Sequence, residues 1–427
     1  MEPPWPGMRY TINSSEQMKM LLTILSTIFF FTVSAAKIIV GPGMPVTSLR
    51  QALIIAHDGD TILLKSGTYK EGNIIITKSV SLVGIDHPVL DGQDKYEILT
   101  ISGRNIVVRG ITFRNSGYSA MNDFASIKVI DASNITIENN TIIDAYFAIH
   151  LSNTAYAIIR HNDIAGAPKS EQLTGNGIHL WKSSHVLIDG NHVRGHRDGI
   201  YFEFVSFSTV QNNLSENNIR YGIHFMFSND DIYFNNIFRK NGAGVAVMYS
   251  KKVNMEWNHF EENWGGSSYG ILLKDISDSY IQHNTFFRNT IALHLEGTSR
   301  MEIRQNLFRE NGWAVKVQAS CDDNHFHDNN FLGNSFDVGT NGTMVLNTFD
   351  NNYWDKYEGY DLNKDGIGDV PYHPVSMYSM IVEENPNSLI LLRSFMVNLL
   401  DKAEKAIPSL TPENLVDNKP RMKPNKL

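Results

Sequence analysis

Ten asparagines recur through the chain at intervals of 22 to 29 residues, and this ladder restricts the possible folds more than any other feature. Most are followed two positions later by an apolar residue, and short segments of alternating apolar and polar residues precede the rungs. That alternation is the period of a half-buried strand. A repeat of this length, with short strands and no helical stretch, is typical of one coil of a parallel β-helix. The ten residues are Asn140, Asn162, Asn191, Asn213, Asn236, Asn258, Asn284, Asn306, Asn329 and Asn352.

Stacking of the coils explains why the asparagines align. A coil cannot bury its own apolar side, so it packs against its neighbours, and aligned amide side chains can hydrogen-bond along the stack. We therefore interpret the asparagines as structural residues. The sequence predicts an all-β protein, a right-handed parallel β-helix with coils of about 22 residues over 37–355, followed by a helical C-terminal extension.

Composition excludes several classes of partner and cofactor. The formal net charge of −8 and the isoelectric point near 6.0 argue against nucleic acid or an anionic membrane surface as a partner. The single cysteine, Cys321, excludes an internal disulfide framework and a metal cluster of the CxxC type.

The N-terminus has the pattern of an export signal. Lys19 precedes an apolar run over 21–33, which ends in small residues. A charged segment, a short apolar segment and a small-residue cleavage site together indicate a signal peptide over 1–36, cleaved near Ala35 or Ala36. The apolar run is too short to cross a bilayer easily, since roughly 20 residues are needed, so an uncleaved anchor is the weaker alternative.

Two segments have helical spacing. Residues 44–56 are expected to cap the open end of the first coil. After Pro374 the pattern becomes helical, and one amphipathic helix is expected to open at Asn385 and stop at Pro408, with an extended tail from Thr411. This helix either packs over the last coil or docks a partner. The candidate docking residues are Leu389, Leu392, Arg393, Phe395, Met396, Leu399 and Leu400.

A second alignment places side chains in two columns on the outer face of the coils. In each coil a strand alternates inward apolar residues with outward residues, so the register is well specified. One predicted column holds His150, His179, Tyr201, His224, Ala246, Leu272, His294 and Lys316, and the other holds Ser152, Trp181, Glu203, Met226, Met248, Lys274, Glu296 and Gln318.

Methionine on an outer face suggests a soft metal. Thioether and imidazole ligands together favour Cu(I). The candidate copper ligands are His224, Met226 and Met248, with His179 and Glu203 beside them. The alternative is that the methionines make ordinary apolar contacts beneath a loop or a partner.

An exported β-helix could also be a polysaccharide lyase, hydrolase or epimerase. That chemistry needs a close pair of carboxylates, or Ca²⁺ beside a basic residue, on one exposed face. Here Glu203 and Glu296 lie four coils apart, and Lys274 lies three coils from Glu203. The spacing weakens the enzyme interpretation, which remains the alternative.

An acidic loop over 356–373 has the spacing of a calcium loop. Oxygen-bearing residues stand at positions one, three, five and nine, a glycine stands at six, and a carbonyl is available at seven. Tyr372 replaces the glutamate expected at position twelve. The alternative is a turn rich in aspartate that binds no metal. The candidate ligands are Asp361, Asn363, Asp365, Ile367 and Asp369.

At these residues the chain resembles the NosD family. The most specific strings are GNGIHLW, RDGIYFEF, YGIHFMFSND and GAGVAVMYSKKVNM, and the C-terminal part resembles the family as well. The resemblance implies a periplasmic, non-catalytic factor for maturation of the copper–sulfur centre of nitrous oxide reductase. Its implied partners are an ABC transporter permease with its ATPase, a small copper chaperone and the apo reductase. It also implies contact with the membrane only through the permease, made by the C-terminal helix.

Overall fold

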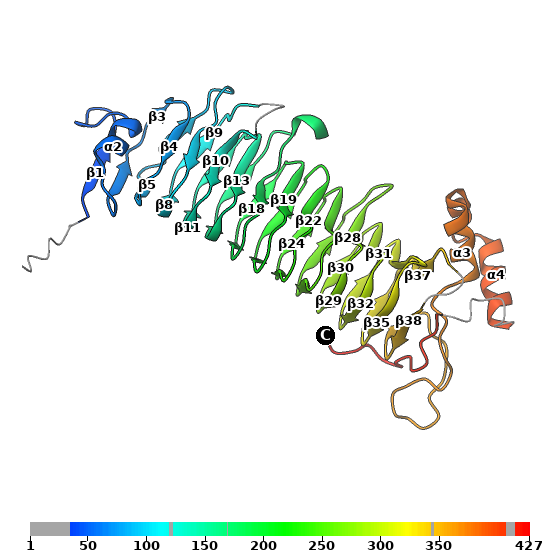
Figure 1. Ribbon diagram of the computed structural model, residues 1–427. Helices are drawn as coiled ribbons and strands as arrows, with labels where there is room; N and C mark the ends of the chain where they lie inside the picture. The colour runs from blue at the N-terminus through cyan, green and yellow to red at the C-terminus, as the bar shows by residue number, and fades with distance from the viewer. Residues whose placement is uncertain (1–34, 119–122, 169, 343–345, 407–414) are drawn as a thin grey trace, which may run out of the picture. The chain divides into compact units, whose positions relative to one another are not determined.

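The computed structural model describes residues 35–118, 123–168, 170–342, 346–406 and 415–427. The expected signal peptide therefore lies almost wholly outside the described residues. Residues 37–427 form one unit. Within it, short strands stack coil upon coil into three parallel sheets, and Figure 1 shows the coils following one another from β1 to β38. The predicted parallel β-helix is confirmed.

Sheet A has fourteen strands, and every neighbouring pair in it is parallel. Its strands are β1 (Lys37–Val40), β2 (Thr61–Leu64), β5 (Ser81–Gly84), β8 (Arg104–Arg109), β11 (Ser133–Glu138), β14 (Ala155–Arg160), β17 (Leu187–Asp189), β20 (Thr209–Gln211), β23 (Ile232–Phe234), β26 (Asn254–Glu256), β29 (Ser277–Gln282), β32 (Ser299–Arg304), β35 (Asp322–His327) and β38 (Leu346–Asp350).

Sheet B has thirteen shorter strands, and it follows sheet A within each coil. Its strands are β3 (Thr68–Tyr69), β6 (Val89–Asp91), β9 (Thr112–Arg114), β12 (Thr141–Ile143), β15 (Asp163–Ala165), β18 (His192–Arg194), β21 (Leu214–Glu216), β24 (Ile237–Arg239), β27 (His259–Glu261), β30 (Thr285–Phe287), β33 (Leu307–Arg309), β36 (Asn330–Leu332) and β39 (Tyr353–Trp354).

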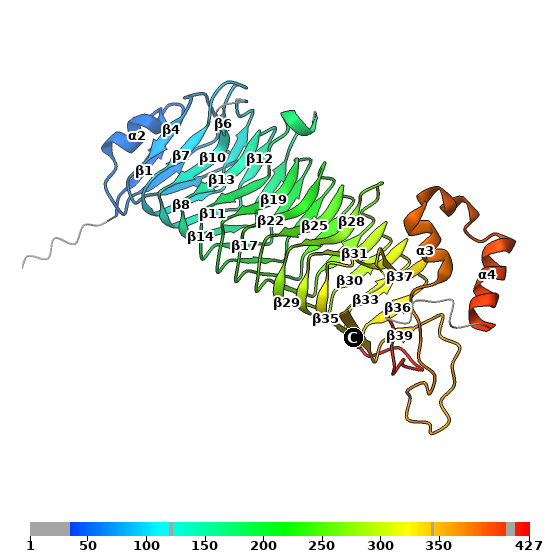
Figure 2. The same cartoon turned by 45° about the vertical axis from the view of Figure 1, so that its right-hand side comes forward.

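Sheet C has twelve strands and completes each coil; Figure 2 shows many of them side by side. Its strands are β4 (Ile74–Ile76), β7 (Leu99–Ile101), β10 (Ala125–Ile130), β13 (Phe147–Ser152), β16 (Ile178–Trp181), β19 (Asp198–Glu203), β22 (Tyr221–Met226), β25 (Ala243–Met248), β28 (Tyr269–Lys274), β31 (Ile291–Glu296), β34 (Trp313–Val317) and β37 (Phe336–Thr340).

The asparagine ladder lies at the turn between sheets A and B, and all ten rungs are buried. Along the ladder the side-chain NH₂ group and the backbone N–H of one rung donate to the Oδ1 atom of the next, as in Asn258 and Asn284. The residue before each rung has φ between 53° and 62°. This left-handed conformation makes the corner of the coil, and asparagine, aspartate and glycine tolerate it better than other residues do.

A second ladder, which the sequence analysis missed, lies five residues further on, at the turn between sheets B and C. Each member donates its backbone N–H to the side-chain oxygen of the next. The sequence contains a signal for this second ladder, because another asparagine follows most of the later rungs of the first ladder by five residues. Its members are His196, Asn218, Asn241, Asn263, Asn289, Asn311 and Asn334.

Aromatic rings fill the core behind sheet B. Phe238, Phe260, Phe286 and Phe308 are fully buried, and their ring centroids lie 4.8 to 5.3 Å apart from coil to coil. Burial of one such ring stabilises the fold by roughly 1.5–3 kcal/mol. Cys321 is also buried, and its Sγ accepts the N–H of Thr298 at 3.5 Å, so the single cysteine is one more rung of a ladder.

At the first coil, α2 (Leu49–Ile55) lies inside the segment expected to be helical. Ser48 caps it by accepting the N–H of Gln51, and Leu49 and Ala52 are part of the buried core.

The C-terminal region differs from the single helix that the sequence predicted. Three helical pieces replace it: α3 (Met377–Glu384), the 3₁₀ helix η2 (Pro386–Leu391) and α4 (Phe395–Ala406). Helix α3 was missed; Ser376 caps it by accepting the N–H of Ser379. Between η2 and α4 the chain breaks at Arg393, whose φ is 64°, a left-handed conformation that no α-helix accommodates.

Candidate functional site

The strand register of sheet C produces the two columns that the sequence predicted. Successive coils pair Ser152 with Trp181, Trp181 with Glu203, Glu203 with Met226, Met226 with Met248, and Met248 with Lys274. The neighbouring column runs from His150 to Lys316 through His179, Tyr201, His224, Ala246, Leu272 and His294.

The structure brings Glu203, Met226 and Met248 together on three successive coils, about 4.8 Å apart along the stack. All three side chains are half-buried. The Tyr201 hydroxyl lies 3.5 Å from the Met226 Sδ and 3.4 Å from the Glu203 Oε2, so one phenol contacts both the thioether and the carboxylate. Two thioethers and one carboxylate thus face the same patch.

His224 joins this patch from the adjacent column. It lies two positions before Met226 on β22, about 6.7 Å away along the strand. Contrary to the expectation of an outward, exposed imidazole, His224 is only 5% exposed. Neither of its ring nitrogens has a hydrogen-bond partner among the described residues.

His179 does not converge with the other candidates. It is paired with Tyr201, and the Tyr201 ring separates it from His224, with centroid distances of 4.7 Å to His179 and 5.0 Å to His224. His179 instead contacts His150, whose ring centroid is 4.7 Å away. Neighbouring rings in this column therefore form a continuous stack of imidazole and phenol groups.

Burial sets the protonation of this stack. It lowers the pKa of His150 from 6.5 to about 4, with the nearby Lys128 acting in the same direction. Burial, His150 and Arg197 together hold the pKa of His179 well below its ordinary value. Burial and the Glu203 carboxylate raise the pKa of Tyr201 to about 12. At neutral pH the two imidazoles are neutral and keep a lone pair, whereas Tyr201 remains a hydrogen-bond donor.

The sequence analysis did not identify Asp198, a buried carboxylate beside His224, as a site residue. Asp198 opens β19 and is fully buried; its Oδ2 lies 3.8 Å from the His224 Nδ1 and 3.5 Å from the Arg197 Nε. Within the described chain, neither oxygen of Asp198 has a hydrogen-bond partner. An opposite charge nearby is what a buried carboxylate requires, and Arg197 supplies it.

An exposed aromatic edge borders the thioether patch. Phe204, Phe227 and Tyr249 directly follow Glu203, Met226 and Met248, and they stack with ring centroids 5.2 and 5.1 Å apart. All three are exposed. The sequence contains a signal for this edge, because an aromatic residue directly follows the outward residue in three consecutive coils.

Among the described residues of the two outward columns there is no close pair of carboxylates. Glu203 and Glu296 are separated by four strand spacings, about 19 Å, and Glu296 is paired with Lys274 at 3.0 Å. Asp198 lies five residues from Glu203 on one strand, about 17 Å away between Cα atoms. Glycosidases place their two carboxyl groups about 5 to 9.5 Å apart.

The acidic loop is folded around Asp361. Its Oδ1 accepts the N–H of Lys364 and its Oδ2 accepts the N–H of Gly366, which has φ of 86°. Asp361 and Gly366 are the first and sixth positions of the predicted calcium loop. The carboxylates of Asp365 and Asp369 accept hydrogen bonds within the loop, and among the described residues the loop's carboxylates do not gather around one point. Both side chains would have to turn to join Asp361, Asn363 and the Ile367 carbonyl around one ion.

The C-terminal helices expose an apolar surface. Val382 of α3 and Val397 of α4 pack with Trp313 and Phe336 in a small cluster on the last coils of sheet C. Figure 1 shows α3 beside β37 with α4 next to it. The opposite side of η2 and α4 is left uncovered, with Phe395 81% exposed. No helix in the described residues is long and apolar enough to span a bilayer.

Of the seven predicted docking residues, five are exposed and two are half-buried. Leu392 and Leu400 are half-buried, and Leu392 packs against the cluster. The exposed ones are Leu389, Arg393, Phe395, Met396 and Leu399.

Comparison with known proteins agrees with this architecture. The family model described as periplasmic copper-binding protein (NosD) matches residues 167–363. A probable ABC transporter binding protein NosD of Pseudomonas aeruginosa is 29% identical over 396 residues, which cover 87% of this chain and 90% of that protein. A protein of the same name from Stutzerimonas stutzeri is 27% identical over 386 residues, covering 84% of this chain and 86% of that protein.

Solved structures share the fold. A GH87 α-1,3-glucanase catalytic domain in complex with tetrasaccharides superposes with a TM-score of 0.59 at 13% identity, covering 74% of this chain and 69% of that chain. The catalytic unit of the GH87 α-1,3-glucanase of Streptomyces thermodiastaticus gives 0.58 at 13% identity, covering 72% and 65%. At this identity the likeness shows the fold alone.

The fold and this face define a parallel β-helix protein whose outer surface combines thioether, imidazole and carboxylate groups. The family match spans the three coils that carry Glu203, His224, Met226 and Met248. Residues 167–363 match the NosD family model, and the chain is similar over most of its length to two proteins named NosD.

Proposed function

We propose that this protein is a non-catalytic periplasmic factor that takes up Cu(I) and hands it over while docked on an ABC transporter. The observation that carries the proposal is the pairing of Met226 with Met248 on adjacent strands, next to Glu203 and His224. The description of the family as periplasmic and copper-binding, and the relatives' name of ABC transporter binding protein, support it.

Ligand chemistry favours Cu(I) as the cargo on this patch. Thioethers are soft ligands and select Cu(I), and neutral imidazoles are compatible with it. Metal transfer requires that an incoming ligand can reach the ion, and the half-buried Met226 and Met248 provide such access. His224 supplies a buried nitrogen donor in the adjacent column, and His179 in the neighbouring ring stack is a more distant donor.

The experiment is an anaerobic Cu(I) titration of the mature protein against a competing chelator. We expect about one equivalent to bind with both methionines present, and to be lost in Met226→Leu with Met248→Leu, because leucine keeps the volume and removes the sulfur. Met396→Leu on α4 is the matched control and should bind normally. Unchanged binding in the double variant would refute this site assignment.

The uncovered side of η2 and α4 is the proposed contact with the permease. Monomeric proteins rarely expose contiguous apolar surface of this kind, which marks an interaction site. Leu389, Phe395, Met396 and Leu399 are all exposed there, while Val397 holds α4 against the β-helix.

Charge substitution tests this contact without unfolding the β-helix. Phe395→Glu with Leu399→Glu should abolish co-purification with the permease and its ATPase, because a desolvated carboxylate opposes an apolar interface. Ile54→Glu, at a similarly exposed position on α2, is the control and should leave co-purification intact. Retention of the complex by the α4 variant would show that the helices only cover the last coils.

The family resemblance extends the proposal to the partners on either side of the transfer. A small copper chaperone would deliver Cu(I), and the apo nitrous oxide reductase would receive it. The aromatic edge of Phe204, Phe227 and Tyr249 borders the thioether patch and offers an apolar rim for such a protein to rest on.

We further propose a structural Ca²⁺ in the acidic loop, held through Asp361, Asp365 and Asp369 with oxygens of Asn363 and Ile367. Support comes from the hydrogen bond that joins the first and sixth positions of the loop.

A further inference from the structure

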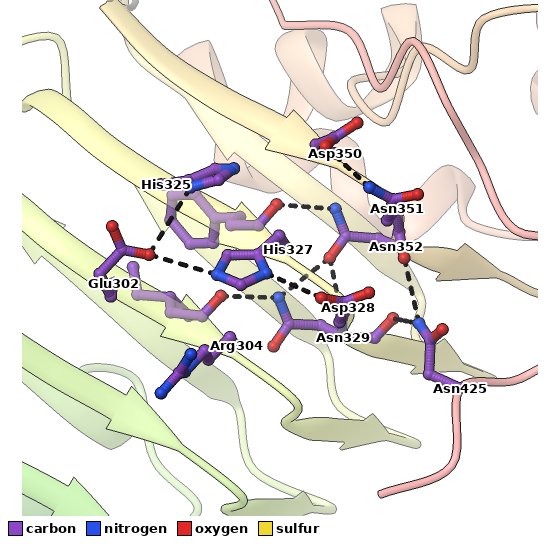
Figure 3. Close-up of polar contacts among 12 residues, drawn as sticks. Glu302, Arg304, His325, His327, Asp328, Asn329, Asp350, Asn351, Asn352 and Asn425 are labelled. Atoms are coloured by element: carbon purple, nitrogen blue, oxygen red, sulfur yellow. Dashed lines mark hydrogen bonds and ion pairs between the residues drawn. The ribbon is translucent and has the colours of Figure 1, made fainter.

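A second group of metal-binding side chains lies on sheet A, away from the thioether patch of sheet C. Glu302 of β32 is directly paired with His325 of β35, and His327 stands two positions further along β35 on the same face. Among the described residues this is the one group of three His, Cys, Asp or Glu side chains whose ligand atoms all lie within 4.8 Å of one another. Figure 3 shows both imidazoles turned toward the Glu302 carboxylate.

The separations between the donor atoms fit one small ion. The Glu302 Oε2 lies 3.6 Å from the His325 Nδ1 and 3.2 Å from the His327 Nε2. Ligands about 2.0–2.1 Å from a tetrahedral ion are about 3.3 Å from each other. Both distances from the carboxylate are close to this spacing, the three ligand atoms all lie within 4.8 Å of one another, and two neighbouring β-strands hold them there.

A fourth side chain positions His327. The Asp328 Oδ2 lies 2.8 Å from the His327 Nδ1, on the side of the ring opposite Glu302 (Figure 3). A metal-bound histidine almost always donates its other ring N–H to a carboxylate or carbonyl, which fixes the tautomer and raises ligand basicity. In the tautomer whose Nδ1–H donates to Asp328, the Nε2 lone pair of His327 is on the side of Glu302 and is available to a metal ion.

A purely structural ion pair explains these contacts less well. The two imidazole rings stack with centroids 4.4 Å apart, and both address a single carboxylate. Arg304, two positions after Glu302 on the same strand, does not pair with this carboxylate among the described residues; its Nε donates to the Gln282 Oε1 at 3.0 Å.

We propose that Glu302, His325 and His327 bind one divalent transition-metal ion of the Cu²⁺ and Zn²⁺ class, with Asp328 as a positioning residue. Imidazole and carboxylate donors suit such ions, whereas thioethers suit Cu(I). Three protein ligands leave one coordination position open. The side chains of Glu302, His325 and His327 are 43%, 39% and 19% exposed, so that position is reachable from solvent. This site does not depend on the proposed Cu(I) function.

The test uses Cu²⁺ alone as the probe, with the mature protein in air and electron paramagnetic resonance as the readout. We expect one equivalent of bound Cu²⁺ with coupling to two imidazole nitrogens, displaced by excess Zn²⁺. His325→Gln with His327→Gln should lose it. His161→Gln with His185→Gln, at two exposed positions in the turns next to β14 and β17, is the matched control and should keep it. Met226→Leu with Met248→Leu should also keep it, which separates this site from the Cu(I) patch.

Asp328→Asn tests the positioning role. It should retain one equivalent but weaken binding by about 10-fold to 100-fold, the usual effect of losing such a partner. A Cu²⁺ signal that survives unchanged in the double histidine variant would overturn the site. So would the absence of a two-nitrogen signal in the unaltered protein. Equal affinity in Asp328→Asn would remove Asp328 from the proposal.

Discussion

Asp231 is a buried acid directly before β23 of sheet A, and its replacement leads to a quantitative prediction. It is fully buried just before β23, where its Oδ1 accepts the N–H of Ser208 at 2.9 Å and its Oδ2 has no partner among the described residues. In later coils the position equivalent to Asp231 is occupied by Asn324 and then by Asn347. The Asn324 NH₂ group donates to the Asn347 Oδ1. Asparagine is therefore a natural occupant of this position.

Burial raises the pKa of Asp231 from 3.8 to about 8. The folded protein then retains a proton that the unfolded chain releases, so the free energy of unfolding falls as pH rises from about 4 to 8. Each pH unit in this window is worth about 1.4 kcal/mol. At pH 7, about three units above the ordinary pKa, the loss in the free energy of unfolding amounts to about 4 kcal/mol. At pH 5, about one unit above it, the loss amounts to about 1.5 kcal/mol.

Asp231→Asn keeps the Oδ1 acceptor and replaces the titrating oxygen with an amide. We expect it to stabilise the protein by about 4 kcal/mol at pH 7 but by less than half of that at pH 5. Guanidinium denaturation at both pH values measures the difference. Asn324→Asp is the mirror control and should introduce a similar loss of stability with rising pH. An equal gain at pH 5 and pH 7 would show that the Asp231 proton is not the cause.

Three further predictions concern the ladder, its end and the acidic loop. Asn258→Ala should lower the free energy of unfolding by at least about 3 kcal/mol in denaturant melts. The substitution removes hydrogen-bond partners from the Tyr233 carbonyl and from the neighbouring rungs. A change below about 1 kcal/mol would contradict a stabilising role of the ladder. Asp417→Ala should cost about 3 kcal/mol and expose the last coil to proteases, because the Asp417 Oδ2 accepts three N–H groups from Asn352 and Trp354; an unchanged cleavage pattern would argue against this closure. A calcium chelator should lower the thermal midpoint of the protein but not that of Asp361→Asn, and an identical midpoint with and without chelator would remove Ca²⁺ from the loop.

The sequence alone determined the coil, its strand register and the columns on sheet C. The reason is that a stacked repeat has almost only nearest-neighbour contacts. Once alternation sets which residues face inward, a slip of one residue would bury the polar set, so the pairing of Met226 with Met248 follows from the spacing.

Burial of the outward residues was decided only by the tertiary structure. His224 occupies an outward column, yet it is buried against Asp198 and the rings of Tyr201 and Tyr221. Periodicity reports which face a side chain occupies but carries no information about what the turns and neighbouring rings place over it.

The end of the stack was likewise decided by contacts remote in sequence. Asp417 reaches back over 65 residues to receive the last rung, Asn352, and thereby replaces an eleventh asparagine. The break at Arg393 left Val397 to pack on the β-helix and Phe395 to face outward. The pairing of Glu302 with His325 follows from the same coil spacing, but only the tertiary structure shows that the side chains of Glu302, His325 and His327 turn toward one another, with ligand atoms within 4.8 Å.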